Sequence, residues 1–167
     1  MVSPRPRQTA ALPLPVGSTG LRRTLAVKTL LTLVLWAGPA LFLPAPWFPL
    51  LGIPQPPLAQ LVFVRLLGAA YVALCVGYAM AWRAPSRHPA VVLVGIVSNA
   101  LAALAILSVG SAGGFDGWSP LGAAYIWGSC LAAAAIAIAL SITGRPLLRK
   151  IAAERPHVVA TRGGGLR

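Results

Sequence analysis

Four long apolar stretches separated by short polar segments dominate this chain. They cover approximately residues 25–43, 58–82, 90–109 and 121–142, and each is close to the ~20 residues that a helix needs to cross a bilayer. Lipid offers no hydrogen bonds, so a spanning segment must pair its own backbone groups, as a helix does. We therefore expect an all-α membrane protein, a four-transmembrane-helix up-down bundle that has the lipid bilayer as its surroundings.

The basic residues predict how this bundle is oriented. The chain has 14 Lys and Arg residues, and all except Arg65 fall in the N-terminal arm through Lys28, the loop after the second stretch, or the C-terminal tail. Cytoplasmic loops are enriched in Lys and Arg. We expect an N-in/C-in, multi-pass protein of the cytoplasmic (inner) membrane, with both termini in the cytoplasm. The abundance of Arg, Ala, Gly and Pro favours a bacterial source.

The polar segments also set the expected domain boundaries. Residues 1–23 are rich in Pro and Arg, which predicts a disordered basic cytoplasmic arm. Residues 24–143 form the transmembrane domain, with a kink at Pro39, and residues 144–167 form a basic cytoplasmic tail. We expect the residues Gly144 to Pro146 to end the fourth helix.

Two further segments allow more than one interpretation. The sequence LRRTLAVK is also similar to a twin-arginine export signal with cleavage near Ala45, although an ordinary first span fits its length better. The segment PAPWFPLLGIPQPP contains six prolines and no charge, so it cannot form a regular helix. We place it at the outer surface with Trp47 and Phe48 at headgroup level; whether it re-enters the bilayer stays open.

Several classes of protein are disfavoured. No Asp or Glu lies within a predicted span, which argues against ion-coupled carriers that use buried carboxylates. No catalytic motif is present. Neither His residue lies in a predicted span where it could bind a haem, and the two Cys residues are not clustered as metal ligands would be. We therefore expect no enzyme activity, no cofactor and no metal. The net charge of +12 reflects topology, and we expect no nucleic acid as a partner.

Arg65 is the charged residue that lies within a predicted span without belonging to a cytoplasmic flank. Its side chain could snorkel to the outer headgroups, pair with Asp116 in the last outer loop, or hold an anionic ligand. We take Arg65 and Asp116 together as a candidate ligand or pairing site.

Polar residues near the bilayer centre form a second candidate site. Tyr71, Asn99 and Ser129 each lie ~14–17 Å along their spans at 1.5 Å per residue, so they could form a midplane polar layer. Such a layer either holds the helices together by hydrogen bonds or forms the floor of a ligand pocket. Small residues at spacing four also predict packing ridges: Ala69, Ala73, Gly77 and Ala81; Gly95, Asn99 and Ala103; Ala124, Gly128 and Ala132.

Three segments, RLLGAAYVALCVGYAMAWR, GIVSNALAALAIL and GAAYIWGSCLAAAA, resemble small bacterial four-helix membrane proteins that are loosely DoxX-like. The resemblance covers about three of the four helices. It implies association with membrane redox complexes and quinone chemistry, and it makes Arg65 and the region of Tyr71 and Asn99 a candidate pocket. This chain has Tyr125 two residues before Trp127, where that family has an acid just before its Trp.

Three functions follow from these observations. The leading one is a structural or accessory subunit of a membrane assembly, with a membrane protein partner or a homo-oligomer. The alternative is a binder of a lipid, quinone or other apolar small molecule at a pocket near Arg65. The third is a transporter or channel subunit.

Overall fold

The computed structural model describes residues 17–162. All its long elements are helices. Four helical segments are long and apolar enough to cross a membrane: Thr19–Phe42, Leu58–Arg83, Pro89–Ser111 and Pro120–Lys150. The first combines α1 (Gly17–Leu31), the π-helix η1 (Thr32–Ala37) and α2 (Gly38–Phe42), and the others belong to α3 (Leu58–Arg83), α4 (Pro89–Ser111) and α5 (Pro120–Arg162). This arrangement confirms the predicted four-helix membrane bundle.

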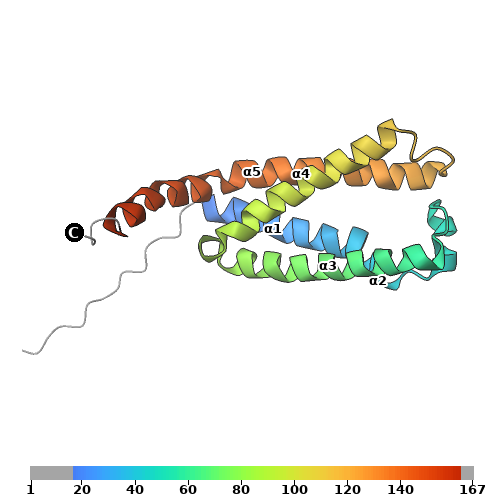
Figure 1. The fold of residues 1–167 in the computed structure, drawn as a ribbon, viewed down its shortest axis with the longest axis horizontal. Helices are drawn as coiled ribbons and strands as arrows, with labels where there is room; N and C mark the ends of the chain where they lie inside the picture. Colours follow the sequence, from blue (N-terminus) through green and yellow to red (C-terminus); the bar gives the residue numbers. More distant parts are fainter. Residues whose placement is uncertain (1–16, 163–167) are drawn as a thin grey trace, which may run out of the picture.

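The helices form two antiparallel pairs, α1 with α3 and α4 with α5 (Figure 1). The α4 and α5 helices pack along each other, and α1 packs on both α3 and α5. We call one end of the bundle the arginine end, because Arg22 lies there against the last residue of α3, Arg83. We call the other end the loop end; there the backbone N–H of Ser119 donates to the carbonyl of Gly52 at 3.3 Å.

Two apolar clusters make up the core. The cluster at the arginine end contains Leu21, Leu25, Tyr78, Ala81, Val92 and Leu140. The cluster nearer the loop end contains Ala103, Ile106, Cys130 and Ala133. Many large apolar side chains outside these clusters are exposed, with Phe63 and Leu131 each 72% exposed. Exposed apolar side chains on every helix are what a bilayer requires of a bundle that it surrounds.

The first helix begins earlier than the sequence pattern predicted. Residues from Gly17 onward are already helical, so the expected disordered arm does not extend to residue 23. The part of that prediction that covers residues 1–16 lies outside the described residues. The reason is packing: Leu21 and Leu25 are buried at the four-residue spacing of one helix face.

Pro39 does not end or isolate a helix. Proline has no N–H, so the carbonyl of Leu35 lacks its α-helical donor. The chain responds with the wider π-helical turn η1 just before it, in which the Gly38 N–H donates to the Leu33 carbonyl. The Tyr125 hydroxyl of α5 donates to the Leu35 carbonyl, which supplies the missing partner.

The fourth helix does not stop at Gly144, contrary to the prediction. The α5 helix has 43 residues, or ~64 Å at 1.5 Å per residue, about twice the ~30 Å hydrocarbon core. Gly144 marks a helix crossing, since a Cβ there would lie 3.1 Å from Val92 Cγ1. The C-terminal part of α5 projects beyond the other helices (Figure 1). The predicted tail is therefore helical to residue 162, and residues 163–167 lie outside the described range.

The loop end is folded against the bundle. As predicted, the proline-rich segment forms no long helix; it makes two short 3₁₀ turns, η2 (Ala45–Trp47) and η3 (Pro49–Leu51). Trp47 is 56% exposed, whereas Phe48 is buried. At the arginine end the short connection between α3 and α4 is another 3₁₀ turn, η4 (Pro85–Arg87).

Candidate functional site

Arg65 closes the end of the first span. Its two terminal guanidinium nitrogens donate to the carbonyl oxygens of Ala40, at 2.7 Å, and Leu43, at 2.5 Å. The last carbonyls of a helix have no partner within the helix, and a cation at a helix C-terminus also interacts favourably with the helix dipole. Arg65 therefore acts as a side-chain cap for α2, a fourth arrangement beside the three that the sequence left open.

Asp116 has a separate position. It lies in the turn between α4 and α5, where a Cβ on Gly113 would lie 2.7 Å from its Oδ2 atom. Gly113 has a positive φ of 76°, and this conformation lets the carboxylate fold over the turn. Within the described part of the chain, Arg65 donates to the two carbonyls and forms no ion pair with Asp116.

Of the predicted polar layer, two residues meet at one cavity. Tyr71 and Asn99 both line it, whereas Ser129 does not. Ser129 is nevertheless buried, with 3% of its surface exposed. It lies about one turn nearer the loop end than the α5 residues that line the cavity.

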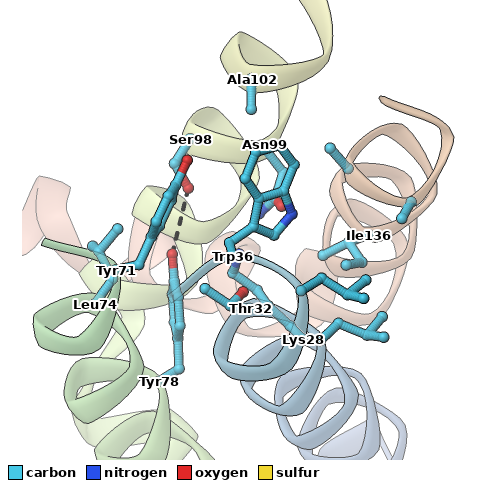
Figure 2. Close-up of a pocket in the computed structure, with 14 residues that line it drawn as sticks. Lys28, Thr32, Trp36, Tyr71, Leu74, Tyr78, Ser98, Asn99, Ala102 and Ile136 are labelled. Atoms are coloured by element: carbon cyan, nitrogen blue, oxygen red, sulfur yellow. Dashed lines mark hydrogen bonds between the residues drawn. The ribbon is translucent and has the colours of Figure 1, made fainter. Parts of the chain in front are cut away.

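The cavity lies inside the bundle between the two apolar clusters (Figure 2). Its volume is about 70 Å³, and all four spans contribute to its wall. The lining residues that carry polar groups are Lys28, Thr32, Trp36, Tyr71, Tyr78, Ser98 and Asn99. Because one water needs only ~10–15 Å³ of such a volume, the cavity has room for a few waters or one small ion or molecule.

Lys28 places a charged group in the buried wall of this cavity. Only 3% of its surface is exposed, and its Nζ lies 4.4 Å from the centroid of the Tyr78 ring. An ammonium over an aromatic face is stabilised by ~2 kcal/mol when desolvated. A cation at the centre of a spanning helix costs ~2.5–3.5 kcal/mol on insertion scales. The ring therefore offsets a substantial part, but not all, of the cost of placing this charge there.

Hydroxyl and amide groups of α3 and α4 also line the cavity. The Tyr78 and Ser98 hydroxyl oxygens lie 3.4 Å apart, and Asn99 Nδ2 donates to the Gly95 carbonyl at 2.5 Å. Figure 2 shows Tyr78 and Ser98 joined across the space between α3 and α4. Polar groups buried together in this way keep the cavity suitable for a polar occupant.

Trp36 forms the wall of the cavity nearer the loop end. Its ring lies between Tyr71, with centroids 6.0 Å apart, and Tyr125, at 6.1 Å. The π-helical turn that Pro39 requires brings Thr32 and Trp36 to the cavity. Such π-helical turns are frequent at functional sites, and this one links a backbone irregularity directly to the cavity.

Sequence reasoning missed Lys28 because it was assigned to the cytoplasmic flank. A signal for its burial was present in the sequence. Leu21, Leu25, Lys28 and Thr32 follow the 4–3–4 spacing of one helix face, and all four are buried. Extending the helix upstream of residue 25 would have placed Lys28 on the core face beside two leucines.

The polar groups that line the cavity include several hydrogen-bond donors. The described residues contain no cluster of His, Cys, Asp or Glu that could hold a metal ion. Cys75 and Cys130 are buried free thiols on different helices, and their sulfur atoms approach the carbonyls of Thr29 at 3.8 Å and Ala103 at 3.6 Å.

In comparisons with known proteins, no protein-family model, no curated protein and no solved structure matches this chain. The resemblance to DoxX-like proteins therefore stays a prediction from the sequence.

Proposed function

We propose that this small helical membrane protein binds a small polar ligand inside its bundle and has no enzymatic activity. The single observation that supports this is the position of Lys28, which is buried at a cavity lined by residues from all four spans, with polar groups from the first three of them. A buried ionisable residue within a membrane span is expensive and marks a functional site by default. Structural stability alone gives no reason for a lysine at this position.

The cavity now replaces the region near Arg65 as the proposed pocket. Both terminal nitrogens of Arg65 already bind backbone carbonyls, so fewer of its donors are free to hold a ligand. Pockets for drug-sized ligands measure ~300–1,000 Å³, whereas this cavity measures about 70 Å³. A lipid or a quinone headgroup would not fit without movement of the helices, so a much smaller ligand is the better candidate.

A matched pair of variants tests ligand binding. Ala102 lines the cavity, whereas Ala105 is exposed on the same helix. Ala102→Val should fill part of the cavity, and Ala105→Val adds the same atoms on the outer face. In a thermal-unfolding screen of small anions, amides and ammonium ions, a true ligand raises the Tm by mass action. We expect at least one compound to stabilise wild type and Ala105→Val and not Ala102→Val.

The ligand-binding proposal fails if every compound acts alike on wild type and the two variants. It also fails if the compounds that stabilise the protein do so equally in Ala102→Val, because these compounds would bind elsewhere. Circular dichroism at low temperature serves as the control for folding of each variant.

A second candidate function is that of a subunit in a membrane assembly, and one observation favours it. Ala124 and Gly128 are exposed on α5, and no atom lies within 4 Å of a Cβ built on Gly128. Small residues at spacing four let helices approach closely in lipid. This face of α5 is therefore available for a second copy of the chain or another membrane helix.

Cross-linking in native membranes tests this second function. Gly128→Leu should abolish a cross-linked species of fixed mass, whereas Ala105→Val should leave it intact. A product of unchanged yield in Gly128→Leu would rule out this face as the interface. The N-in/C-in orientation in a bacterial inner membrane belongs to the same proposal; it is supported by the basic residues at the arginine end.

A further inference from the structure

We infer that the cavity beside Lys28 is a binding site for a small monovalent anion, of the size of a halide, nitrate or formate. This inference rests on the proposed ligand-binding function and specifies its chemistry. Three features support it: the distance of the acidic positions from Lys28, the donors at the cavity and the cavity volume.

The two acids of the sequence occupy backbone positions away from Lys28. The chain has two acidic residues, Asp116 and Glu154. Asp116 lies at the loop end, in the turn that precedes the first residue of α5. Glu154 follows Thr143 by 11 residues, or ~16 Å along α5 at 1.5 Å per residue. Both therefore lie well away from the buried ammonium.

The positions of the helices make the separation from Glu154 large. Gly20 lies beside Thr143, since a Cβ on Gly20 would be 3.7 Å from Thr143 Cγ2. From that level α1 runs toward the loop end and reaches Lys28 after ~12 Å, whereas α5 runs the opposite way to Glu154. Among the side chains that the structure describes, no carboxylate lines the cavity with Lys28, and a bound anion would supply the counter-charge.

The cavity wall is suited to an anion. Thr32 and Tyr71 carry hydroxyl groups that can donate, and Trp36 carries an indole N–H; all three line the cavity with Lys28. The negative face of the Tyr78 ring already lies against the ammonium. Hydrogen bonds to a charged group are stronger than those between neutral groups, so several neutral donors around one ammonium favour an anionic occupant.

The cavity volume limits the size of the anion. A volume of about 70 Å³ is several times the ~10–15 Å³ that one water requires. A halide, nitrate, bicarbonate or formate ion fits such a space, whereas gluconate, a six-carbon anion, does not. Gluconate therefore serves as the control anion of equal charge.

The lysine content of the chain permits a selective experiment. Lys28 and Lys150 are the two lysines of the sequence, and Lys150 is exposed on α5. Protein labelled with ¹³C at the lysine Cε gives one NMR signal for each, and Lys150→Gln assigns them without touching the cavity. Sodium bromide and sodium formate are titrated at constant ionic strength against sodium gluconate.

We expect bromide and formate to shift the Lys28 signal in a saturable way, and the Lys150 signal to follow ionic strength only. Gluconate should leave the Lys28 signal unchanged. Thr32→Val should lower the apparent formate affinity about threefold to tenfold, because it removes one donor to a charged ligand. Valine has nearly the same shape as threonine and carries a methyl in place of the hydroxyl. We therefore expect this variant to fold.

Formamide, which is neutral and similar in size to formate, separates the two proposals. If formamide saturates the Lys28 signal and the anions do not, the anion assignment is overturned and ligand binding in the cavity stands. If neither formamide nor the anions give a saturable shift, both proposals are overturned. A saturable shift with gluconate of the same size as with formate would also contradict a site of this volume.

Discussion

The ammonium nitrogen of Lys28, near the middle of the first span, lies 4.4 Å from the centre of the Tyr78 ring on α3. This contact joins two helices that also meet at the arginine end, where Arg22 donates to the Arg83 carbonyl at 3.0 Å. It fixes a charge beside a polar cavity within a bundle whose outer faces are apolar. The groups that stabilise this buried charge and the helices around it can each be tested by substitution.

Replacing Lys28 with methionine should make the empty protein more stable. Methionine keeps most of the length of the side chain and removes a buried charge that costs about 2.5–3.5 kcal/mol at the centre of a span, of which the Tyr78 ring offsets about 2 kcal/mol. The measurement is the Tm in detergent in gluconate buffer. A Tm below that of wild type would show that the lysine charge is compensated within the chain itself.

Removing the Arg65 cap should destabilise the bundle. Arg65→Met deletes two charge-assisted hydrogen bonds, at about 1.5–3 kcal/mol each, and leaves the Ala40 and Leu43 carbonyls without these donors. Asp116→Asn should change the stability little. The measurement is the free energy of unfolding in denaturant.

The exchanged double variant Arg65→Asp/Asp116→Arg distinguishes this cap from an ion pair. We expect it to be at least as unstable as Arg65→Asp alone. Recovery of wild-type stability in the double variant would instead support the pair of Arg65 with Asp116.

Tyr125 and Pro39 should be energetically coupled. Tyr125→Phe removes the donor to the Leu35 carbonyl, at a cost of about 1–3 kcal/mol for a buried acceptor without a partner. Pro39→Ala restores a backbone N–H that can serve the same carbonyl, so Tyr125→Phe should cost less in that background. A double-mutant cycle measures the coupling; strictly additive effects would contradict the shared acceptor.

Two glycines should respond oppositely to alanine. A Cβ on Gly68 would lie 2.8 Å from Leu41 Cγ, whereas one on Gly128 meets no atom within 4 Å. Gly68→Ala should therefore destabilise the monomer by about 1–3 kcal/mol through overpacking. Gly128→Ala should be neutral or stabilise it by up to about 1 kcal/mol, because alanine is the better helix former. Equal effects in a thermal-unfolding assay would show that α2 and α3 do not approach at Gly68.

Asn99→Leu tests the part of the midplane layer that the structure brings together. Asn99 bonds the carbonyl of Gly95 within its own helix, so its loss should change stability by no more than about 1 kcal/mol. The larger effect should be on binding, since leucine extends into a cavity that Asn99 lines. Unchanged ligand affinity, measured by the NMR titration, would remove Asn99 from the site.

The number and approximate limits of the spans could be predicted from the sequence, because length and hydropathy alone determine which segments suit a bilayer. Helix ends were less predictable. Glycine and proline often end helices, yet α5 continues through Gly144 and Pro146. The missing side chain at Gly144 lets α4 approach α5 closely there.

Helix faces were predicted unevenly. The ridge of Gly95, Asn99 and Ala103 is buried as expected, but Ala124 and Gly128 are exposed. In an alanine-rich helix, spacing of four occurs on several faces, so it does not identify the packed one. The buried face of α5 contains Ser129 and Ala133 instead.

The candidate site depended on contacts between distant segments, which a single sequence does not reveal. Tyr71 and Asn99 were placed at similar depth from helix rise alone, and they do line one cavity. The sequence suggests a pair of Arg65 with Asp116, because it shows two opposite charges on the same side of the membrane. Its actual partners are backbone carbonyls, and every helix end has these whatever its sequence.

Anomalous diffraction from crystals grown in a lipid mesophase with sodium bromide tests the anion site most directly. We expect a bromide ion within hydrogen-bond distance of Lys28 Nζ, inside the cavity that Thr32 and Tyr71 line. Bromide found only among the arginines at the arginine end, with Lys28 turned out of the cavity, would contradict it.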